Sequence, residues 1–483
     1  MKISPVRHHA YPAAARPRAA AADSQPADSF QASSPASVLG GKQFADSHGR
    51  VTHLALMLSD SYATRGMRAQ ILDAYKTLFS EMEPDTRFTV VVESNRDKAD
   101  VEALASQAPN PERIQIVKPD VGRLTVWARD MMVPEFIPGD SEHTILVQQT
   151  PLHNWHDNDS AVPPAITQAN PRILLDVAPQ LVTDGGEVMS NTRESFVGYY
   201  SVAATAKQLE KAVTSVAGLQ ARLAAEYEER TGNHVLNPDG KAVFPFEFVP
   251  QAELGHRLPY KLKNLEAPRL EGGVSLAQMY EDEAVNLFET QLGKPVTVMG
   301  KDDPDTRHVE EPATDHLDMG LTPVDDHTFF VGDPGLATRL LAEMTPQERR
   351  EAEAKLEQQL GHPVSLSQVG PENRDNPEDF ENYVRVVEKK GYKVVRMPHA
   401  EAGRVGAPYV SYNNCLMERF EKDGHEIRRV FLPVYGIDKL DNYAIKTWQE
   451  QGFEVHPMPL GVLSTRWGAL RCISNWLDRG PQP

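Results

Sequence analysis

The chain has few cysteines, and this scarcity limits how it can be stabilised. Only two occur among 483 residues, Cys415 and Cys472. Two cysteines cannot make a disulfide framework in a chain of this length. A small scaffold built on disulfides is therefore excluded, and at least one of the two thiols is a candidate for reactive chemistry.

Long apolar runs are missing as well. No stretch approaches the roughly 20 residues that a helix needs to cross a bilayer. No basic stretch followed by an apolar one and a small-residue cleavage site opens the chain. We therefore expect a cytoplasmic protein with no membrane partner, and a non-classical secretion route stays open.

Acidic residues outnumber basic ones in this chain. Lys and Arg total 50 against 68 Asp and Glu, which gives a formal charge of −18. An acidic surface repels polyphosphate, so we expect no nucleic-acid partner. The same field attracts a cationic ligand. Because 40% of the residues are hydrophobic, the chain can still bury a large core.

The standard catalytic signatures are absent. The chain has no Gly-rich dinucleotide fingerprint, no phosphate loop, no serine nucleophile elbow and no pair of zinc-binding histidines on a helix. The run "HNWHDND" from His153 to Asp159 offers metal-ligand residue types, but no distant partner motif accompanies it. We interpret it as a solvated loop and expect no metal site.

A strand-helix-strand unit recurs along the chain. Residues 1–45, rich in Ala, Pro and Ser, are expected to form a disordered tail. Hydrophobic periodicity then predicts a strand, a helix and a strand over 51–60, 64–82 and 87–94. The same pattern returns over 327–335, 336–344 and 392–398, and over 428–436, 442–452 and 453–459. Repetition of the unit predicts an α/β architecture built from several similar modules within one domain, 46–483.

Two charged helical segments accompany the modules. Between about 208 and 305 a charged helix is followed by irregular segments broken by Pro and Gly. We interpret the whole of 208–305 as an insertion. A lid that controls which compound enters the site is one use for it, and a surface embellishment or an oligomer contact is the other. A second helix is expected over 345–361, with Thr345 as its cap and Pro346 in its first turn.

Four segments place a charged or reactive group inside or beside an apolar run: "TVWARDMMVPEF", "LVTDGGEVMSN", "TDHLDMGLTPVDDHTFFVGD" and "GALRCISNW". A guanidinium ligand would explain them together. That ion is planar and always charged, and carboxylates placed edge-on satisfy its donors best. Asp130 and Asp318 are the candidate carboxylates, with Glu187 as a third or as a support.

The remaining side chains of these segments add the chemistry. His316 and Asp318 are two residues apart, so an extended "HLDMG" would turn both toward one face. Cys472 supplies a nucleophilic thiolate, and Arg471 together with a bound cation would lower its pKa from about 8.5. Trp127 is either a stacking surface for the guanidinium or a buried core residue.

Taken in order, these motifs resemble the guanidine-modifying enzymes of the pentein superfamily, most closely the agmatine and peptidylarginine deiminases. The resemblance extends over roughly 51–476. It rests on five motifs in the order of the family: Trp127 with Arg129-Asp130, Asp184-Gly185-Gly186-Glu187, His316-Leu317-Asp318, Ser411-Tyr412-Asn413-Asn414, and Cys472 with its neighbours Gly468 and Ser474.

The resemblance implies a pentein-type α/β propeller, in which five strand-rich modules surround a pseudo-fivefold axis. It also implies the reaction. Cys472 would attack the guanidinium carbon, His316 would protonate the leaving amine and then activate water, and Asp130 and Asp318 would hold the other nitrogens. No metal or organic cofactor takes part in the family mechanism. Glu187, Asn414 and Trp127 are then the expected substrate contacts.

The substrate stays open at this stage. The run Trp467 to Arg471 departs from the Gly-rich sequence that precedes the cysteine in agmatine deiminases, and Arg471-Cys472 is similar to the ending of arginine deiminases. Free arginine, agmatine and an arginine-containing peptide or protein are all candidates. An amidinotransferase, which passes the amidino group to an amine, and a non-catalytic binding member are the alternative functions.

Overall fold

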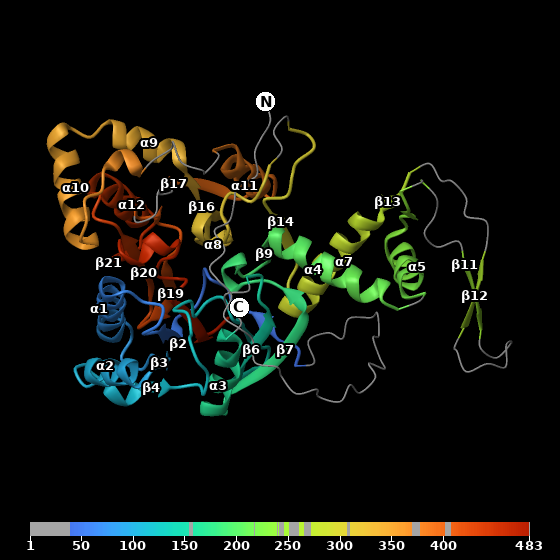
Figure 1. The fold of residues 1–483 in the computed structure, drawn as a ribbon, viewed down its shortest axis with the longest axis horizontal. Helices are drawn as coiled ribbons and strands as arrows, with labels where there is room; N and C mark the ends of the chain where they lie inside the picture. The colour runs from blue at the N-terminus through green and yellow to red at the C-terminus, as the bar shows by residue number, and fades with distance from the viewer. Residues whose placement is uncertain are drawn as a thin grey trace, which may run out of the picture. The chain divides into compact units, whose positions relative to one another are not determined.

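The computed structural model describes residues 39–153, 158–216, 218–238, 240, 246–250, 260–264, 272–306, 310–369, 377–400 and 407–482 (Figure 1). Residues 1–38 of the expected tail lie outside this part. Before residue 45 the chain is already structured, because β1 (Lys42–Gln43) pairs with β5 (Val133–Ile137) and Phe44 is buried. The "HNWHDND" run is described only at its two ends, since 154–157 also lie outside the described residues.

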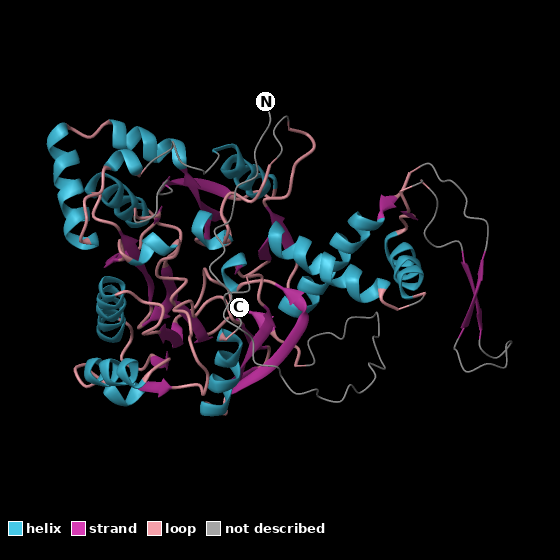
Figure 2. Cartoon of the chain, viewed as in Figure 1, coloured by secondary structure: helices cyan, strands magenta, loops and turns pink. Residues whose placement is uncertain are grey.

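Five of the sheets contain three or four strands and share one plan. Each has an antiparallel strand pair, and one of its strands is joined through helical structure to a parallel neighbour. Helices and strands therefore alternate along the chain (Figure 2). This confirms the predicted mixed α/β fold and the repeated strand-helix-strand unit.

The first sheet joins both ends of the described chain. Its strand order is β22-β2-β3-β4, and β22 near the C-terminus runs antiparallel to β2. Helix α1 begins after Thr64, whose hydroxyl accepts the N–H of Met67. The elements are β2 (Val51–Leu58), α1 (Arg65–Glu81), β3 (Arg87–Val92), α2 (Asn95–Ala105), β4 (Ile114–Val117) and β22 (Ser474–Arg479).

A buried histidine in this sheet makes stability depend on pH. His53 on β2 is 2% exposed, and its Nε2 hydrogen-bonds Thr89 Oγ1 on β3 at 2.8 Å. Burial, helped by Arg87, lowers the pKa of His53 from 6.5 to about 3. The unfolded chain therefore binds this proton more readily than the folded one. The His53 contribution to stability is present above pH 6.5 and is lost as pH falls toward 3.

The first prediction follows from this pKa. A shift of this size corresponds to about 5 kcal/mol, so wild-type protein should lose unfolding free energy between pH 6.5 and 4 more steeply than His53→Gln. Denaturant titrations at several pH values measure the two slopes. His143→Gln is the control, because that side chain is 38% exposed, and it should keep the wild-type slope. Parallel profiles for wild type and His53→Gln would contradict the prediction.

The second sheet has the order β1-β5-β6-β7 and the third β14-β9-β8. The expected insertion 208–305 falls in the crossover of the third sheet, where α4 and α7 pack side by side (Figure 1). Its last strand, β14, pairs in parallel with β9 and so belongs to that sheet. The elements not yet given are β6 (Asp140–Thr150), α3 (Val162–Ala169), β7 (Ile173–Val182), β8 (Val188–Ser190), β9 (Ser195–Gly198), α4 (Tyr199–Thr214), α5 (Leu219–Thr231), β10 (Val235–Leu236), β11 (Phe246–Pro250), β12 (Tyr260–Asn264), β13 (Val274–Ser275), α7 (Leu276–Leu292) and β14 (Val296–Met299).

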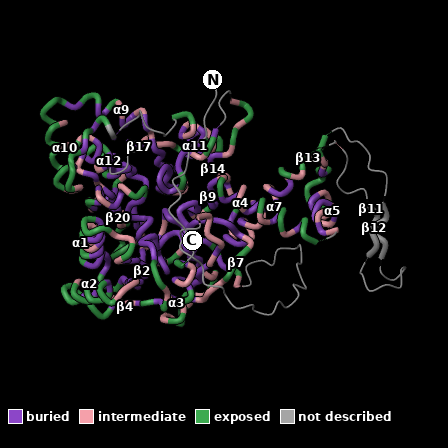
Figure 3. Tube along the Cα trace, in the orientation of Figure 1, coloured by how far each residue is buried: buried purple, intermediate pink, exposed green. Residues whose placement is uncertain are grey.

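The fourth and fifth sheets have the orders β15-β16-β17-β18 and β19-β20-β21. As predicted, Thr345 caps α10, and Pro346 is its first residue. This helix is largely exposed (Figure 3). The elements are α8 (Leu317–Gly320), β15 (Leu321–Pro323), β16 (Thr328–Asp333), α9 (Pro334–Ala342), α10 (Pro346–Leu360), α11 (Pro377–Lys389), β17 (Lys393–Ala400), β18 (Val410–Ser411), β19 (Leu416–Lys422), β20 (His425–Val434), α12 (Asp438–Glu450) and β21 (Glu454–Pro459).

Apolar clusters hold neighbouring sheets together. Separate clusters join the first sheet to the second, the first to the fifth, the third to the fourth and the fourth to the fifth. Buried pairs from these clusters are Met57 with Leu146, Leu54 with Phe431, Phe196 with Phe329, and Phe330 with Leu432. Because close-packed cores resist displacement, loops at the strand ends are held in fixed positions. In the described part of the chain, no helix is long and apolar enough to cross a membrane.

Candidate active site

Cys472 lies in the turn that precedes β22, with 2% of its surface exposed. The side chain of Asn414 holds this turn. Its Nδ2 donates to Cys472 Sγ at 3.1 Å, and its Oδ1 accepts the backbone N–H groups of Ala469 and Cys472, each at 3.2 Å. Asn414 was expected to contact substrate. In the structure its amide holds the Cys472 turn and contacts the thiol.

His316 and Asp318 lie beside the thiol, and two further carboxylates, Asp184 and Asp130, face His316. His316 Nε2 is 3.3 Å from Asp184 Oδ2, and its Nδ1 is 3.8 Å from Asp130 Oδ1. One side-chain ligand atom from each of His316, Asp318 and Cys472 lies within 4.8 Å of the others. The structure thus brings together the four residues that the sequence nominated for catalysis, although they come from distant parts of the chain.

The local conformation of the His-x-Asp motif differs from the prediction. Leu317–Gly320 form the single helical turn α8 rather than a strand, and only His316 at its N-cap is extended. Leu317 and Met319 are buried, and Gly320 packs against the rings of Phe380 and Tyr383. These apolar contacts favour the turn. His316 and Asp318 still reach the same site, because one precedes the turn and the other lies within it.

Without a bound cation, Arg471 does not lower the pKa of the thiol below its ordinary value. Its guanidinium is buried and already neutralised: Nη1 donates to Asp318 Oδ2 at 2.6 Å and Nη2 to Asp46 Oδ1 at 2.9 Å. Burial, followed by the charge of Asp318, raises the pKa of Cys472 to about 11; Asp130 adds to this shift and His316 opposes it. In the resting protein the thiol is protonated at neutral pH.

The imidazole carries a proton more readily than usual. Burial alone would lower the pKa of His316, but Asp130, Asp184 and Cys472 outweigh burial and raise it well above 6.5. A protonated His316 can donate to a leaving group. The site thus combines a thiol, an acid and carboxylates on more than one side.

Trp127 and Arg129 support the Cys472 turn. Trp127 is 7% exposed, its Nε1 donates to Tyr62 Oη at 3.0 Å, and its ring packs against Gly468, where a side chain would collide with it. The guanidinium of Arg129 lies 3.9 Å from the ring centre of Trp476. Burial, followed by the charge of Arg471, lowers the pKa of Arg129 well below its ordinary value.

Glu187 has an unusual environment for a charged substrate contact. It is 1% exposed, and its Oε1 accepts no hydrogen bond from the described residues. Burial raises the pKa of Glu187 well above 4.5, with His316 opposing and Asp184 adding to the shift. Burial thus favours the uncharged form of this carboxyl.

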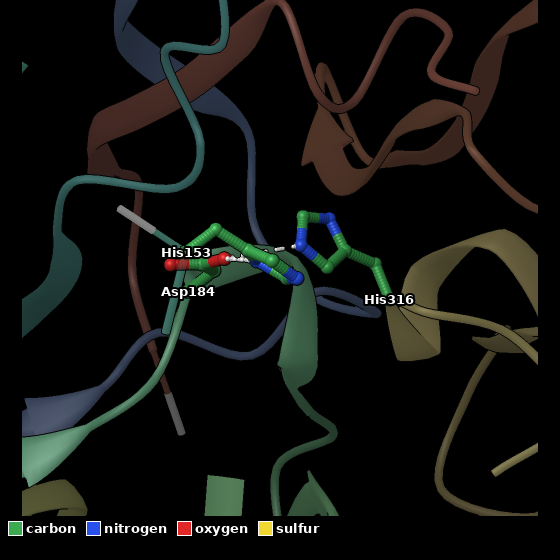
Figure 4. A group of neighbouring side chains, drawn as sticks. All are labelled: His153, Asp184 and His316. Atoms are coloured by element: carbon green, nitrogen blue, oxygen red, sulfur yellow. Dashed lines mark hydrogen bonds and ion pairs between the residues drawn. The ribbon is translucent and has the colours of Figure 1, made fainter. Parts of the chain in front are cut away.

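Asp184 and His153 are the residues that sequence reasoning missed. Asp184 is fully buried, and its Oδ2 contacts both His316 and His153 Nδ1, the latter at 2.5 Å (Figure 4). The Gly185-Gly186 pair is the sequence feature that could have pointed to Asp184, since Gly186 packs directly on the His316 ring. The acid that contacts His316 is Asp184, before the two glycines, and not Glu187, after them. His153, predicted to be solvated, has a side chain only 33% exposed.

Comparison with solved structures identifies proteins of similar fold. An X-ray structure of a protein assigned as an agmatine deiminase aligns with a TM-score of 0.50 and 11% identity, over 90% of this chain and 95% of that one. The chain shares its fold. At 11% identity this likeness is one of fold alone.

Two further agmatine deiminase structures align over similar lengths. The Enterococcus faecalis enzyme has a TM-score of 0.48 and 12% identity, over 91% of this chain and 96% of that one. A cysteine-to-serine variant from C. jejuni with substrate bound has 0.46 and 12%, over 90% and 95%. No protein-family model matches the chain, and no curated protein matches it.

Proposed function

We propose that the protein hydrolyses a guanidino group to a ureido group and ammonia through a covalent intermediate on Cys472. The observation that carries this proposal is the carboxylate of Asp318. Its Oδ2 accepts from Arg471, whereas its buried Oδ1 accepts no hydrogen bond from the described residues, and one oxygen of this carboxylate lies within 4.8 Å of Cys472 Sγ. A buried anionic oxygen without a donor is costly, and a guanidinium N–H would satisfy it.

The proposed steps use the residues in these positions. When the cation binds, the Cys472 thiol releases its proton to solvent. The thiolate adds to the guanidinium carbon, and His316 donates a proton to the nitrogen that leaves as ammonia, which gives a thiouronium on sulfur. Neutral His316 then takes a proton from water as the water oxygen adds to the same carbon. The C–S bond breaks, the ureido product leaves, and the thiol is restored. Asp130 and Asp318 hold the cation, and Asp184 orients His316.

We also infer that the five modules are arranged as a propeller, which the family resemblance implies. The shared apolar clusters between neighbouring sheets support this arrangement. Trp127 is retained as a substrate contact in the proposal.

Incubation with arginine, agmatine and an arginine-containing peptide tests the function. We expect one of the three to yield ammonia and ureido product in equal amounts. Addition of a primary amine acceptor in parallel separates the alternatives. Amidino transfer to that amine without ammonia would identify a transferase. Binding of a guanidino compound with neither product would indicate a non-catalytic member.

The second prediction concerns the thiol. Because the pKa of Cys472 is about 11 in the ligand-free protein, its alkylation by iodoacetamide should be slow at neutral pH and rise toward pH 11. Guanidinium bound between Asp130 and Asp318 cancels charges that raise this pKa, so the midpoint of the profile should shift to lower pH. Peptide mass spectrometry measures the rate at Cys472. A midpoint at or below about 8.5 without ligand would contradict the prediction.

A further inference from the structure

The side chains of His153, Asp184 and His316 lie together in one cluster (Figure 4). His153 follows β6, Asp184 follows β7, and His316 is the N-cap of α8. One ligand atom from each, either a ring nitrogen or a carboxylate oxygen, lies within 4.8 Å of the other two. In the sequence, the "HNWHDND" run has no distant metal-ligand motif to accompany it. The fold brings two such residues, Asp184 and His316, to His153.

Neighbouring groups fix the orientation of this cluster. The backbone N–H of Leu152 donates to Asp184 Oδ1 at 2.9 Å, which leaves Oδ2 directed at both imidazoles. The second nitrogen of His316 faces Asp130 at 3.8 Å. A carboxylate behind a histidine is the arrangement that orients histidine ligands in metal sites. The two imidazole rings are tilted by 57° with centroids 5.8 Å apart, so they are not stacked on each other.

Two imidazoles and one carboxylate are the ligands of an open zinc site. Nitrogen and oxygen ligands about 2.0–2.1 Å from a tetrahedral ion lie about 3.3 Å apart. Asp184 Oδ2 and His316 Nε2 already have this separation, and the 2.5 Å contact of His153 with Asp184 would lengthen by less than 1 Å as the ion replaces the shared proton. The partly exposed edge of His153 gives an ion access from solvent.

We propose that His153, Asp184 and His316 form a binding site for a divalent transition-metal ion such as Zn²⁺, and that occupancy of this site inhibits the enzyme. Binding follows from the three side chains alone. Inhibition rests on the proposed function, because an imidazole with an ion on Nε2 cannot become the doubly protonated imidazolium that donates to the leaving group.

A second cluster shares His316 and competes for the same ion. It consists of His316, Asp318 and Cys472. Asp318 Oδ2 already accepts from the buried guanidinium of Arg471, and Cys472 Sγ accepts from Asn414 Nδ2. An ion there would have to compete with both donors, so the His153 cluster is favoured.

Calorimetric titration of the metal-free full-length protein with Zn²⁺ tests the site, with Co²⁺ absorption as a second readout of the ligand geometry. We expect His153→Ala to lose one equivalent of bound Zn²⁺ relative to wild type, and Cys472→Ser to retain it. His143→Ala is the matched control. His143 Nδ1 also bonds a carboxylate, Asp140 Oδ2 at 2.9 Å, but it belongs to neither cluster of metal-ligand residues found in the described chain.

The outcomes separate the two proposals. An unchanged stoichiometry in His153→Ala, or loss of the equivalent in Cys472→Ser alone, would overturn the site. Guanidino turnover of wild type is then measured with and without Zn²⁺. If no turnover is found but the equivalent is lost as expected, the metal site stands and the proposed function fails. If turnover is found and saturating Zn²⁺ leaves it unchanged, the inhibitory role is refuted.

Discussion

Replacement of Cys472 by alanine should lower turnover of the guanidino substrate at least about 10⁴-fold, because no other group can form the covalent intermediate. Ser474 and the Asn414 amide should keep the turn in place, since the Asn414 bonds to the backbone of Ala469 and Cys472 do not need the sulfur. Thermal denaturation should therefore be close to that of wild type. Steady-state ammonia release measures the effect.

Cys415 provides the matched control. It is also buried, and burial raises the pKa of its thiol well above the ordinary value. His316, which lowers the pKa of Cys472, is not among the groups that act on Cys415. Cys415→Ala should retain most of the activity. If Cys415→Ala were inactive and Cys472→Ala active, the assignment of the nucleophile would be wrong.

Replacement of Arg471 by methionine should destabilise the protein by about 3–5 kcal/mol, the usual cost of leaving a buried ion without its partner. Arg471 is 2% exposed and connects three parts of the chain: Asp46 ahead of β2, the carbonyl of Val188 on β8, and Asp318 in α8. Methionine fills the volume but leaves both carboxylates buried and unpaired. Denaturant titration monitored by intrinsic fluorescence measures the loss.

An exposed pair serves as the comparison. Arg50 makes two hydrogen bonds to Asp85, but its side chain is 26% exposed and that of Asp85 is 67% exposed. Arg50→Met should cost less than about 1 kcal/mol. Adding Asp46→Asn to Arg471→Met should recover part of the stability, because it removes one uncompensated charge. A loss for Arg471→Met no larger than that of Arg50→Met would refute the structural role.

The modules were predictable because their signals are local. Strand β2 is a continuous apolar run buried on both faces, and α1 has apolar residues at helical spacing after a threonine cap. Each of these features depends on neighbours in sequence. The order of the five motifs was equally visible, so Cys472, His316, Asp130 and Asp318 could be nominated without a structure.

The charges of the site depend on contacts that no spacing shows. Arg471 was expected to activate Cys472, yet the fold directs its guanidinium to Asp46 and Asp318, residues 425 and 153 positions away. Glu187 and Asp184 look alike in sequence on either side of two glycines. Burial raises the pKa of Glu187, and contact with two histidines gives Asp184 its place beside the proposed acid.

By itself, the sequence determined the class of fold, the repeated module and the residue types able to act on a guanidino group, because periodicity and motif order are properties of the chain alone. Only the tertiary structure decided which carboxylates face His316, that Asn414 holds the thiol, and that His153 joins the cluster. Burial and electrostatic interactions between residues hundreds of positions apart exist only once the sheets have packed together.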